Sequence, residues 1–448
     1  MMRANQQEAM DAMLPDPSPA ELIAARGQFS LHAMDGLLLE GVPLNAIADS
    51  LGTPTWVYAA GVIRARYRAL AAALAGLAGI HYAVKANDHL AVLRLFSALG
   101  AGADVVSGGE FARARHAGIA ASQIIFSGVG KTVAELREAL AAGIGQVNVE
   151  SAEELAMISA IASAMGREAP VALRVNPDID AGTHPKITTG LRGNKFGIPF
   201  GDIPALYAHA ARLPGICPVG LAVHIGSQIT EAGPYRGALD RIAGLVRALR
   251  EAGERVTRVD CGGGLGIAYR HETALAPALL AGVLRASLGG LDLALVVEPG
   301  RWLVGPAGVL LASVVLVKNA APRPFLVLDA AMNDLLRPAL YDAWHGIVPL
   351  AAKDARATPM AVDVVGPVCE SGDIFAAHRP LPPLVPGARV AILEAGAYGA
   401  VMSSTYNARP LAAAAMVDGA AWAMIRARQT VDDLWRGEIV PPFAEASG

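Results

Sequence analysis

The sequence lacks the features that mark disulfide-bonded or nucleic-acid-binding proteins. Its 448 residues contain three cysteines, Cys217, Cys261 and Cys369, which are too few and too scattered for a disulfide framework and form no C-x-x-C pair. Charged residues make up 17% of the chain and the formal net charge is -3, with no basic stripe or acidic tail. We therefore expect no nucleic-acid or anionic-membrane partner, and a reducing cytoplasm as the compartment.

Long apolar runs are also absent. The longest apolar stretch, residues 304–317, is shorter than the roughly 18 residues of a membrane span and contains Gly305, Pro306 and Gly308. Residues 1–19 are polar and lack the apolar core of a secretion signal. The sequence therefore predicts neither a membrane span nor a secretion signal.

The central part of the chain alternates between short apolar segments and longer segments rich in Ala, Leu, Glu and Arg. Strands are predicted at residues 80–84, 103–106, 123–127, 146–149, 171–175, 220–225, 256–260 and 293–297. Helices are predicted at residues 62–77, 110–117, 133–142, 152–165, 203–213, 235–251 and 275–288. This alternation over roughly 240 residues predicts a (β/α)8 TIM barrel. An open doubly wound sheet is the alternative, disfavoured because no dinucleotide fingerprint opens the first unit.

The flanking regions differ in character from this central part. Residues 1–28 are expected to form a loosely ordered extension, residues 29–58 a segment that joins a β domain, and residues 59–304 the barrel. Residues 305–448 are expected to form a C-terminal β-rich, sandwich- or barrel-like domain, ending in a helix at about 411–428. Its strands are predicted at residues 308–317, 325–328, 361–365 and 389–393. The predicted fold class is α/β.

Reactive or Gly-rich groups follow several of the predicted barrel strands. They are Lys85-Ala86-Asn87, Ser107-Gly108-Gly109-Glu110, His224-Ile225-Gly226-Ser227-Gln228, the segment from Asp260 to Gly266, and Glu298-Pro299-Gly300-Arg301. Because functional groups of such barrels gather at the C-terminal strand ends, we expect these groups to lie close together.

Lys85 ends the first predicted strand. Lysine is rarely buried, and burial lowers the pKa of its ammonium group, which leaves a free amine that can attack a carbonyl. The alternative is a lysine at a strand end that reaches solvent. Taken alone Lys85 fits the alternative, and the groups at the other strand ends favour the nucleophile.

The glycines 262–264 allow successive backbone N–H groups to converge on one anion, such as a phosphate. A tight turn with close packing is the alternative, but barrels commonly bind phosphate after their seventh and eighth strands. Pyridoxal 5'-phosphate needs such donors together with a lysine, a planar group against its ring and a carboxylate at its pyridine nitrogen. Lys85, His224 and Glu298 provide the other three. The alternative for His224 is a core histidine with satisfied hydrogen bonds. The alternative for Glu298 is an ion pair with Arg301.

Several motifs together resemble those of the fold-type III, alanine racemase-like, pyridoxal-phosphate-dependent decarboxylases. They are YAVKAN at 82–87, HIGSQ at 224–228, GGG at 262–264 and EPGR at 298–301. Further motifs are similar to the diaminopimelate decarboxylase family rather than to the ornithine or arginine branches. These are TTG at 188–190, NKFG at 194–197, NDLLRPALY at 333–341, CESGD at 369–373 and GAYG at 396–399. The resemblance extends from about residue 29 to residue 434.

The resemblance implies decarboxylation of meso-2,6-diaminopimelate at its D-centre, which yields L-lysine and CO2, with pyridoxal 5'-phosphate as cofactor. It implies that Lys85 binds the cofactor covalently, that His224 stacks on its ring and that Glu298 meets the pyridine nitrogen. The other cofactor-binding residues that it implies are Ser227, Gly263, Gly264, Pro299, Gly300, Arg301 and Tyr398. It implies no metal.

For the substrate, the resemblance implies that Arg301, Arg337 and Tyr341 bind the distal carboxylate, while Tyr398 contacts both substrate and cofactor. Glu370 is implied to bind the distal ammonium group. Cys369 is implied to deliver a proton to Cα after CO2 leaves. The resemblance also implies a homodimer in which the last two residues reach into the active site of the partner chain.

Other functions on the same fold remain open at this point. One is a decarboxylase of another D-amino acid, such as D-ornithine or D-lysine, or of a related basic amino acid. A racemase would interconvert D and L substrates without releasing CO2. A non-catalytic relative, similar to the antizyme inhibitors, is disfavoured because Lys85 and Cys369 are both present.

Overall fold

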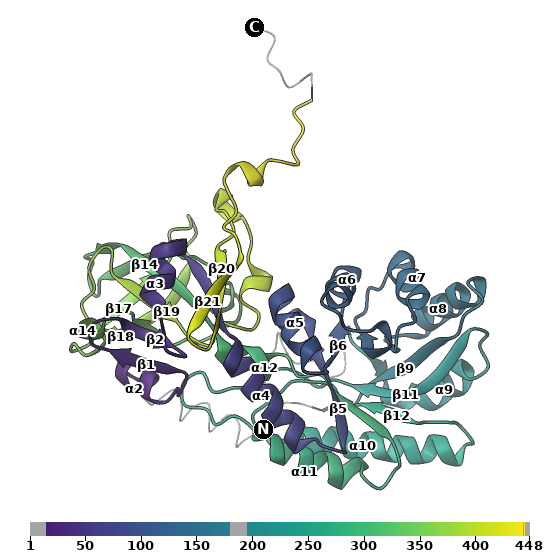
Figure 1. The fold of residues 1–448 in the computed structure, drawn as a ribbon. Coiled ribbons are helices and arrows are strands. Elements are labelled where there is room, and N and C mark those ends of the chain that lie inside the picture. The colour runs from purple at the N-terminus through teal and green to yellow at the C-terminus, as the bar shows by residue number, and fades with distance from the viewer. Residues whose placement is uncertain (1–14, 180–194, 442, 444–448) are drawn as a thin grey trace. The chain divides into compact units, whose positions relative to one another are not determined.

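The computed structural model describes residues 15–179, 195–441 and 443 (Figure 1). The described chain divides into two compact units, and each is built from separate stretches of sequence. The first contains Val62–Ala307 and Gly396–Val401. The second contains Asp16–Gly61, Gly308–Ala395 and the described part of Met402–Gly448.

The first unit is a closed barrel of parallel strands. Its strands are β5 (Ala78–Ala83), β6 (Gly102–Val105), β7 (Ile124–Phe126), β8 (Gln146–Val149), β9 (Ala169–Asn176), β11 (Ile216–Val223), β12 (Arg258–Asp260) and β13 (Ala294–Val297). The ring closes because β13 pairs with β5, while β9 lies between β8 and β11. A short strand, β10 (Ile198–Pro199), extends β9 on one side. The predicted TIM barrel is confirmed, and each predicted barrel strand overlaps an observed one.

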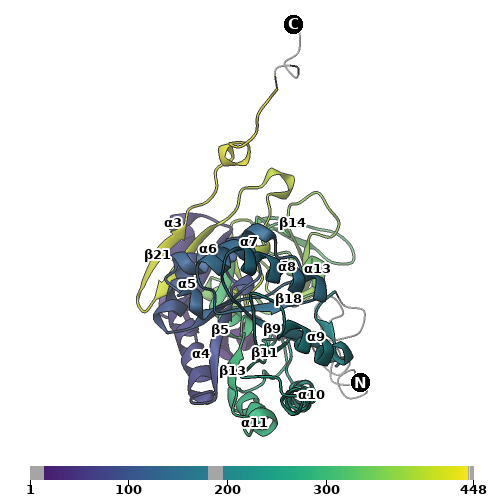
Figure 2. The ribbon, with the colours of Figure 1, turned by 90° about the vertical axis from the view of Figure 1, so that its right-hand side faces the viewer.

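Helices surround the barrel strands, as Figure 2 shows. They are α4 (Ala60–Ala73), α5 (Leu90–Ala98), α6 (Gly108–His116), α7 (Val133–Ala141), α8 (Ala152–Ala164), α9 (Ile203–Ala210), α10 (Ala232–Glu251), α11 (Pro277–Leu288) and the single turn α12 (Arg301–Val304). Ser107, Thr132 and Ser151 cap three of them, because each side-chain oxygen accepts the backbone N–H of a glutamate three residues later. No helix in the described ranges is long and apolar enough to cross a membrane.

The second unit is rich in β-structure. A small antiparallel sheet contains β1 (Phe29–His32), β2 (Gly36–Leu39) and β3 (Val42–Pro43). The larger sheet contains β4 (Thr55–Ala59), β14 (Gly308–Lys318), β15 (Phe325–Leu328), β16 (Ile347–Pro349), β17 (Met360–Val365), β18 (Ile374–Leu381), β19 (Arg389–Ile392), β20 (Ala413–Asp418) and β21 (Ala421–Arg426). The helices are α2 (Pro19–Ala24), α3 (Leu44–Leu51), α13 (Arg337–Tyr341) and α14 (Ala352–Ala355). Strand β4 lies between β14 and β20, so early residues of the chain complete the β-rich unit.

Two expectations about the second unit are wrong. The predicted helix at 411–428 is a β-hairpin of β20 and β21, with Gly419 at φ +59° in the turn. The alanines of β20 are buried against β4, so pairing with an existing strand outweighs the helix propensity of alanine. Part of the expected loose extension, Pro19–Ala24, is a helix that a capping box at Ser18 and Glu21 stabilises. Residues 1–14 of that extension lie outside the described residues.

Candidate active site

Lys85 lies in a single helical turn that directly follows β5. Its Nζ donates a hydrogen bond of 2.8 Å to Oδ2 of Asp104, a fully buried residue of β6. Burial lowers the pKa of Lys85, but the carboxylates of Asp104 and Glu298 outweigh it and hold the pKa above its ordinary value. The expectation of a lowered pKa is therefore wrong for the chain alone. The side chain is 33% exposed, so burial is incomplete while the carboxylates are close.

Glu298 follows β13 and forms a pair of buried carboxyl groups with Asp260 at the end of β12. Burial raises the pKa of Glu298 well above its ordinary value, and it raises the pKa of Asp260 as well. Asp260 accepts hydrogen bonds from Gly262 N (2.9 Å) and from Asn148 Nδ2 (2.8 Å), which favours its charged form. Oε1 of Glu298 has no hydrogen-bond partner among the described residues.

His224 follows β11, and its Nδ1 accepts a hydrogen bond of 3.2 Å from the backbone N–H of Gly263. Burial lowers the pKa of His224 well below its ordinary value, and the nearby cations of Arg174 and Lys85 add to this effect. The imidazole is therefore neutral, with its proton on Nε2. A neutral planar ring is suited to stacking on an aromatic cofactor.

Four of the five expected strand-end groups line a single cavity, which is the juxtaposition that the sequence predicted. Lys85, His224 and Glu298 share this cavity with Ser127, Asn148, Arg174 and Asp260. The polar side chains Ser127, Asn148 and Arg174 were not singled out from the sequence. The available signal was a polar residue within or directly after an otherwise apolar predicted strand.

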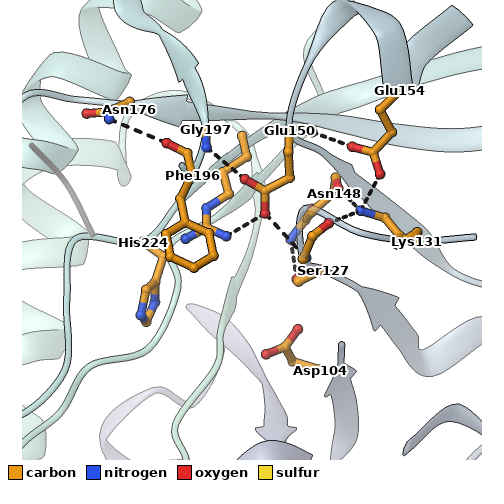
Figure 3. A network of polar contacts seen from close by, with 12 residues as sticks. Asp104, Ser127, Lys131, Asn148, Glu150, Glu154, Asn176, Phe196, Gly197 and His224 are labelled. Atoms are coloured by element: carbon orange, nitrogen blue, oxygen red, sulfur yellow. Dashed lines mark hydrogen bonds and ion pairs between the residues drawn. The ribbon is translucent and has the colours of Figure 1, made fainter. Parts of the chain in front are cut away.

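A hydrogen-bonded network supports this cavity from β8 and the neighbouring strands (Figure 3). Asn148 donates to Ser127 Oγ at 3.0 Å, and Lys131 donates to the backbone oxygen of Asn148 at 2.9 Å. Glu150 accepts from Arg174 at 2.6 Å and from the backbone N–H of Gly197 at 2.7 Å. The cavity wall is therefore tied to the segment that precedes β10.

The glycines 262–264 pack too closely for any side chain. A Cβ atom at Gly263 would lie 2.0 Å from the backbone oxygen of Glu298, and one at Gly264 would lie 2.5 Å from the backbone oxygen of Gly226. Gly262 and Gly264 also have φ values of +68° and +99°. The loop thus brings a bare backbone beside His224 and Glu298.

Arg301 is buried beside this loop rather than paired with Glu298. Its Nη1 donates to Tyr269 Oη at 2.7 Å, and its Nη2 donates to Ser227 Oγ at 3.0 Å. The guanidinium lies 4.8 Å from the ring centroid of Tyr398. Tyr269 was not identified from the sequence, because it falls outside every quoted motif.

Tyr398 belongs to the barrel unit although it is far along the chain. Its backbone N–H donates to the oxygen of Ala86 at 2.8 Å, and Asn87 Nδ2 donates to the oxygen of Gly396 at 3.0 Å. The GAYG motif therefore lies beside the Lys85 turn.

The remaining expected site residues lie in the second unit. Arg337 is buried at the start of α13, and its Nη1 donates to Nε2 of His345 at 2.8 Å, while Nδ1 of this histidine donates to the oxygen of Leu393. Tyr341, at the end of α13, is half-buried. Cys369 and Glu370 are exposed. The TTG motif at 188–190 and residue 194 of the NKFG motif lie outside the described residues.

Exposed groups surround the CESGD motif within the second unit. The backbone N–H of Cys369 donates to Asn407 Oδ1 at 2.9 Å. A hydrogen bond to Glu370 raises the pKa of Tyr406. Cys369 and Glu370, which are expected to act on the substrate, thus lie on an exposed surface and make polar contacts there.

Residues 60–305 match the family model described as "Pyridoxal-dependent decarboxylase, pyridoxal binding domain". The chain belongs to the pyridoxal-dependent decarboxylase family. This match covers the barrel and includes Lys85, His224 and Glu298.

Relatives of this decarboxylase share most of its length. A diaminopimelate decarboxylase of Pseudomonas aeruginosa is 48% identical over 410 residues, covering 91% of this chain and 97% of the relative. One from Zymomonas mobilis is 46% identical over 408 residues, covering 90% and 96%. The solved diaminopimelate decarboxylase of Helicobacter pylori, complexed with L-lysine, is 38% identical with a TM-score of 0.84, covering 88% and 98%.

The residues of this decarboxylase fit pyridoxal phosphate. The buried Glu298 Oε1, which lacks a partner within the described ranges, is an acceptor for a ring nitrogen. The glycine loop packs so closely against neighbouring backbone that no Cβ atom fits, which leaves backbone groups as its donors for a phosphate. Lys85 lies in the same cavity as Glu298, with His224 between loop and cavity.

Proposed function

We infer that this chain is a pyridoxal-phosphate-dependent diaminopimelate decarboxylase, a carboxy-lyase. It removes the carboxyl group at the D-centre of meso-2,6-diaminopimelate and releases L-lysine and CO2, the last step of lysine biosynthesis. The observation that carries this conclusion is the near full-length similarity to diaminopimelate decarboxylases, 47% identity over 91% of the chain in the Pseudomonas fluorescens relative. The cavity that contains Lys85, His224 and Glu298 supports it.

Bound pyridoxal phosphate accepts the electron pair that remains at Cα when CO2 leaves. Lys85 would hold the cofactor covalently, His224 would lie against its ring, and Glu298 would accept a hydrogen bond from its nitrogen. Phosphate ligands would come from Ser227, Gly263, Gly264 and the backbone at Pro299, Gly300 and Arg301. The closed packing of the glycine loop supports this assignment, because it leaves backbone as the only contact surface.

The distal L-centre of the substrate would be recognised by charged and hydroxyl groups. Arg301, Arg337 and Tyr341 would bind its carboxylate, since a guanidinium fork matches a carboxylate. Glu370 would bind its ammonium group, and Tyr398 would contact cofactor and substrate. Cys369 would donate the proton that Cα needs after CO2 leaves. The free thiol of this exposed cysteine supports its role.

We also propose that the enzyme is a cytoplasmic homodimer whose active sites are shared between chains. The exposure of Cys369 and Glu370 within their own unit supports a role at an interface between chains. Cys217, Cys261 and Cys369 are all free thiols, which suits a reducing compartment.

The Lys85→Ala variant tests the proposed chemistry. We expect it to lose both the visible absorbance of the bound cofactor and CO2 release from meso-diaminopimelate, because no other amine of the described chain lines the cavity. Lys353→Ala, at an exposed lysine of α14, is the control and should keep both. A Lys85→Ala protein that keeps the absorbance band and turns over substrate would rule out the proposal.

The Arg337→Ala variant tests the substrate. Loss of a charged partner of the distal carboxylate should cost about 2–5 kcal/mol of transition-state binding. This lowers kcat/KM by roughly 30- to several thousand-fold. D-lysine and D-ornithine lack that carboxylate, so an enzyme made for them would keep its activity. Assays with meso-diaminopimelate, D-lysine, D-ornithine and L-ornithine, on wild type and variant, separate these outcomes.

A further inference from the structure

Tyr235 is a buried residue that the proposed function does not use. It lies in the first turn of α10 with an exposed fraction of 4%. Its hydroxyl donates a hydrogen bond of 3.0 Å to the backbone oxygen of Gly263, in the middle of the glycine loop. Burial raises the pKa of Tyr235, so the hydroxyl keeps its proton and remains a donor.

The Gly263–Gly264 peptide is the group that this hydrogen bond holds. In a trans peptide the C=O and the following N–H point in opposite directions. A carbonyl held toward Tyr235 therefore turns the N–H of Gly264 away from Tyr235. Because glycine stands on both sides, this peptide would otherwise rotate easily.

Other polar groups of the loop are already engaged. The N–H of Gly262 donates to Asp260, the N–H of Gly263 donates to His224, and the oxygen of Gly264 accepts from Ile229 at 2.8 Å. Within the described residues, the N–H of Gly264 has no protein acceptor. It is a donor of the glycine loop that still needs a partner.

We propose that Tyr235 is a positioning residue for the cofactor phosphate, and that its hydroxyl fixes the Gly263–Gly264 peptide so that the Gly264 N–H faces that anion. The inference rests on the proposed function, since it needs pyridoxal phosphate in this cavity. Tyr235 acts through the backbone and touches neither substrate nor cofactor ring. Its contribution should therefore depend on the phosphate group alone.

The test compares pyridoxal 5'-phosphate with pyridoxal, which has the same ring and aldehyde but no phosphate. Protein stripped of cofactor is titrated with each compound, and dissociation constants are read from the visible absorbance. Tyr235→Phe keeps the ring and removes only the hydroxyl. We expect it to weaken pyridoxal phosphate by about 3- to 10-fold, the usual effect of one hydrogen bond, and to leave pyridoxal within about twofold.

Tyr207→Phe is the matched control, because this buried tyrosine of α9 also donates to a backbone oxygen, that of Arg255, at 2.7 Å. It should leave both affinities unchanged. Equal weakening of both compounds by Tyr235→Phe, or no weakening of pyridoxal phosphate, would overturn the inference. If wild type itself prefers neither compound, the proposed function fails instead.

If Tyr235→Phe does not fold, a second measurement on the wild-type protein tests the inference. Hydrogen exchange of wild-type protein is followed by mass spectrometry with inorganic phosphate and with chloride. We expect phosphate to slow exchange in the peptide that contains Gly264. Unchanged exchange there would also overturn the inference, because the amide would then not face the anion.

Discussion

The contact between Lys85 and Asp104 governs the charge of the amine that we propose attacks the cofactor aldehyde. A protonated amine cannot attack a carbonyl, and the buried Asp104 favours the protonated form. In the cofactor-free protein the proposed nucleophile is therefore held in its protonated, inactive form until its proton leaves. Asp104 was not singled out from the sequence, although it is a lone polar residue within an otherwise apolar predicted strand.

Asp104→Asn should move this charge state. Removing the carboxylate removes the largest influence that raises the pKa of Lys85, so burial dominates and the pKa falls. The free amine then exists at lower pH, and the pH profile of cofactor attachment should move to lower pH by about one unit or more. The measurement is the rate of absorbance change on adding pyridoxal phosphate between pH 6 and 10. A profile that stays in place or moves upward would show that Asp104 does not set this charge.

The ion pair between Arg174 of β9 and Glu150 after β8 connects two elements of the barrel. The two side chains are 10% and 3% exposed, and their atoms lie 2.6 Å apart. Removing one partner of a buried pair leaves an uncompensated charge, whereas a surface pair contributes little. The strand ends that form the cavity are thus held partly by electrostatics.

Arg174→Met should lower the free energy of unfolding by about 3 kcal/mol, the lower end for a broken buried pair, because Glu150 keeps hydrogen bonds from Gly197 and Gly128. Arg323→Met breaks the more exposed pair with Asp363. It should change the free energy of unfolding by at most about 1 kcal/mol. Urea denaturation of the cofactor-free proteins measures both. Equal effects would contradict a special role for the buried pair.

At the scale of elements, the sequence predicted what is local and missed what depends on distant partners. The barrel strands are short apolar runs between helices, so composition alone locates them. The hairpin of β20 and β21 was missed because an alanine-rich run favours a helix, while its pairing with β4 connects segments far apart in the sequence. Gly419 between Asp418 and Ala421 was the local signal for a turn.

The same division applies to the candidate site. Lys85, His224 and Glu298 were found because barrel topology places strand ends together. Asn148, Arg174 and Tyr269 were not, because their roles come from hydrogen bonds that only the folded chain defines. The predicted direction of the Lys85 pKa shift was wrong for the same reason, because its carboxylate neighbours lie on other strands.

At the scale of the whole molecule, the proposed shared active site makes a prediction about mixed dimers. Lys85→Ala and Cys369→Ala proteins should each be nearly inactive alone. If Cys369 acts in the partner's site, subunit exchange creates mixed dimers with one intact site and one doubly altered site. A random mixture should then recover about one quarter of wild-type activity, since half of the dimers carry one good site of two. The assay is CO2 release after mixing, and an inactive mixture of exchanged subunits would place both residues in one chain's site.

The hydrogen bond from Asn87 to Gly396 joins residues 309 positions apart and places Tyr398 beside the Lys85 turn. A ribosome that adds about 5–20 residues per second needs roughly 15–60 s to make the intervening chain. During this interval the barrel strands can emerge and pair, but the Lys85 turn lacks its last neighbour. A nascent chain therefore completes the proposed cofactor site only after residue 396 has emerged, and a chain cut short before that residue cannot complete it.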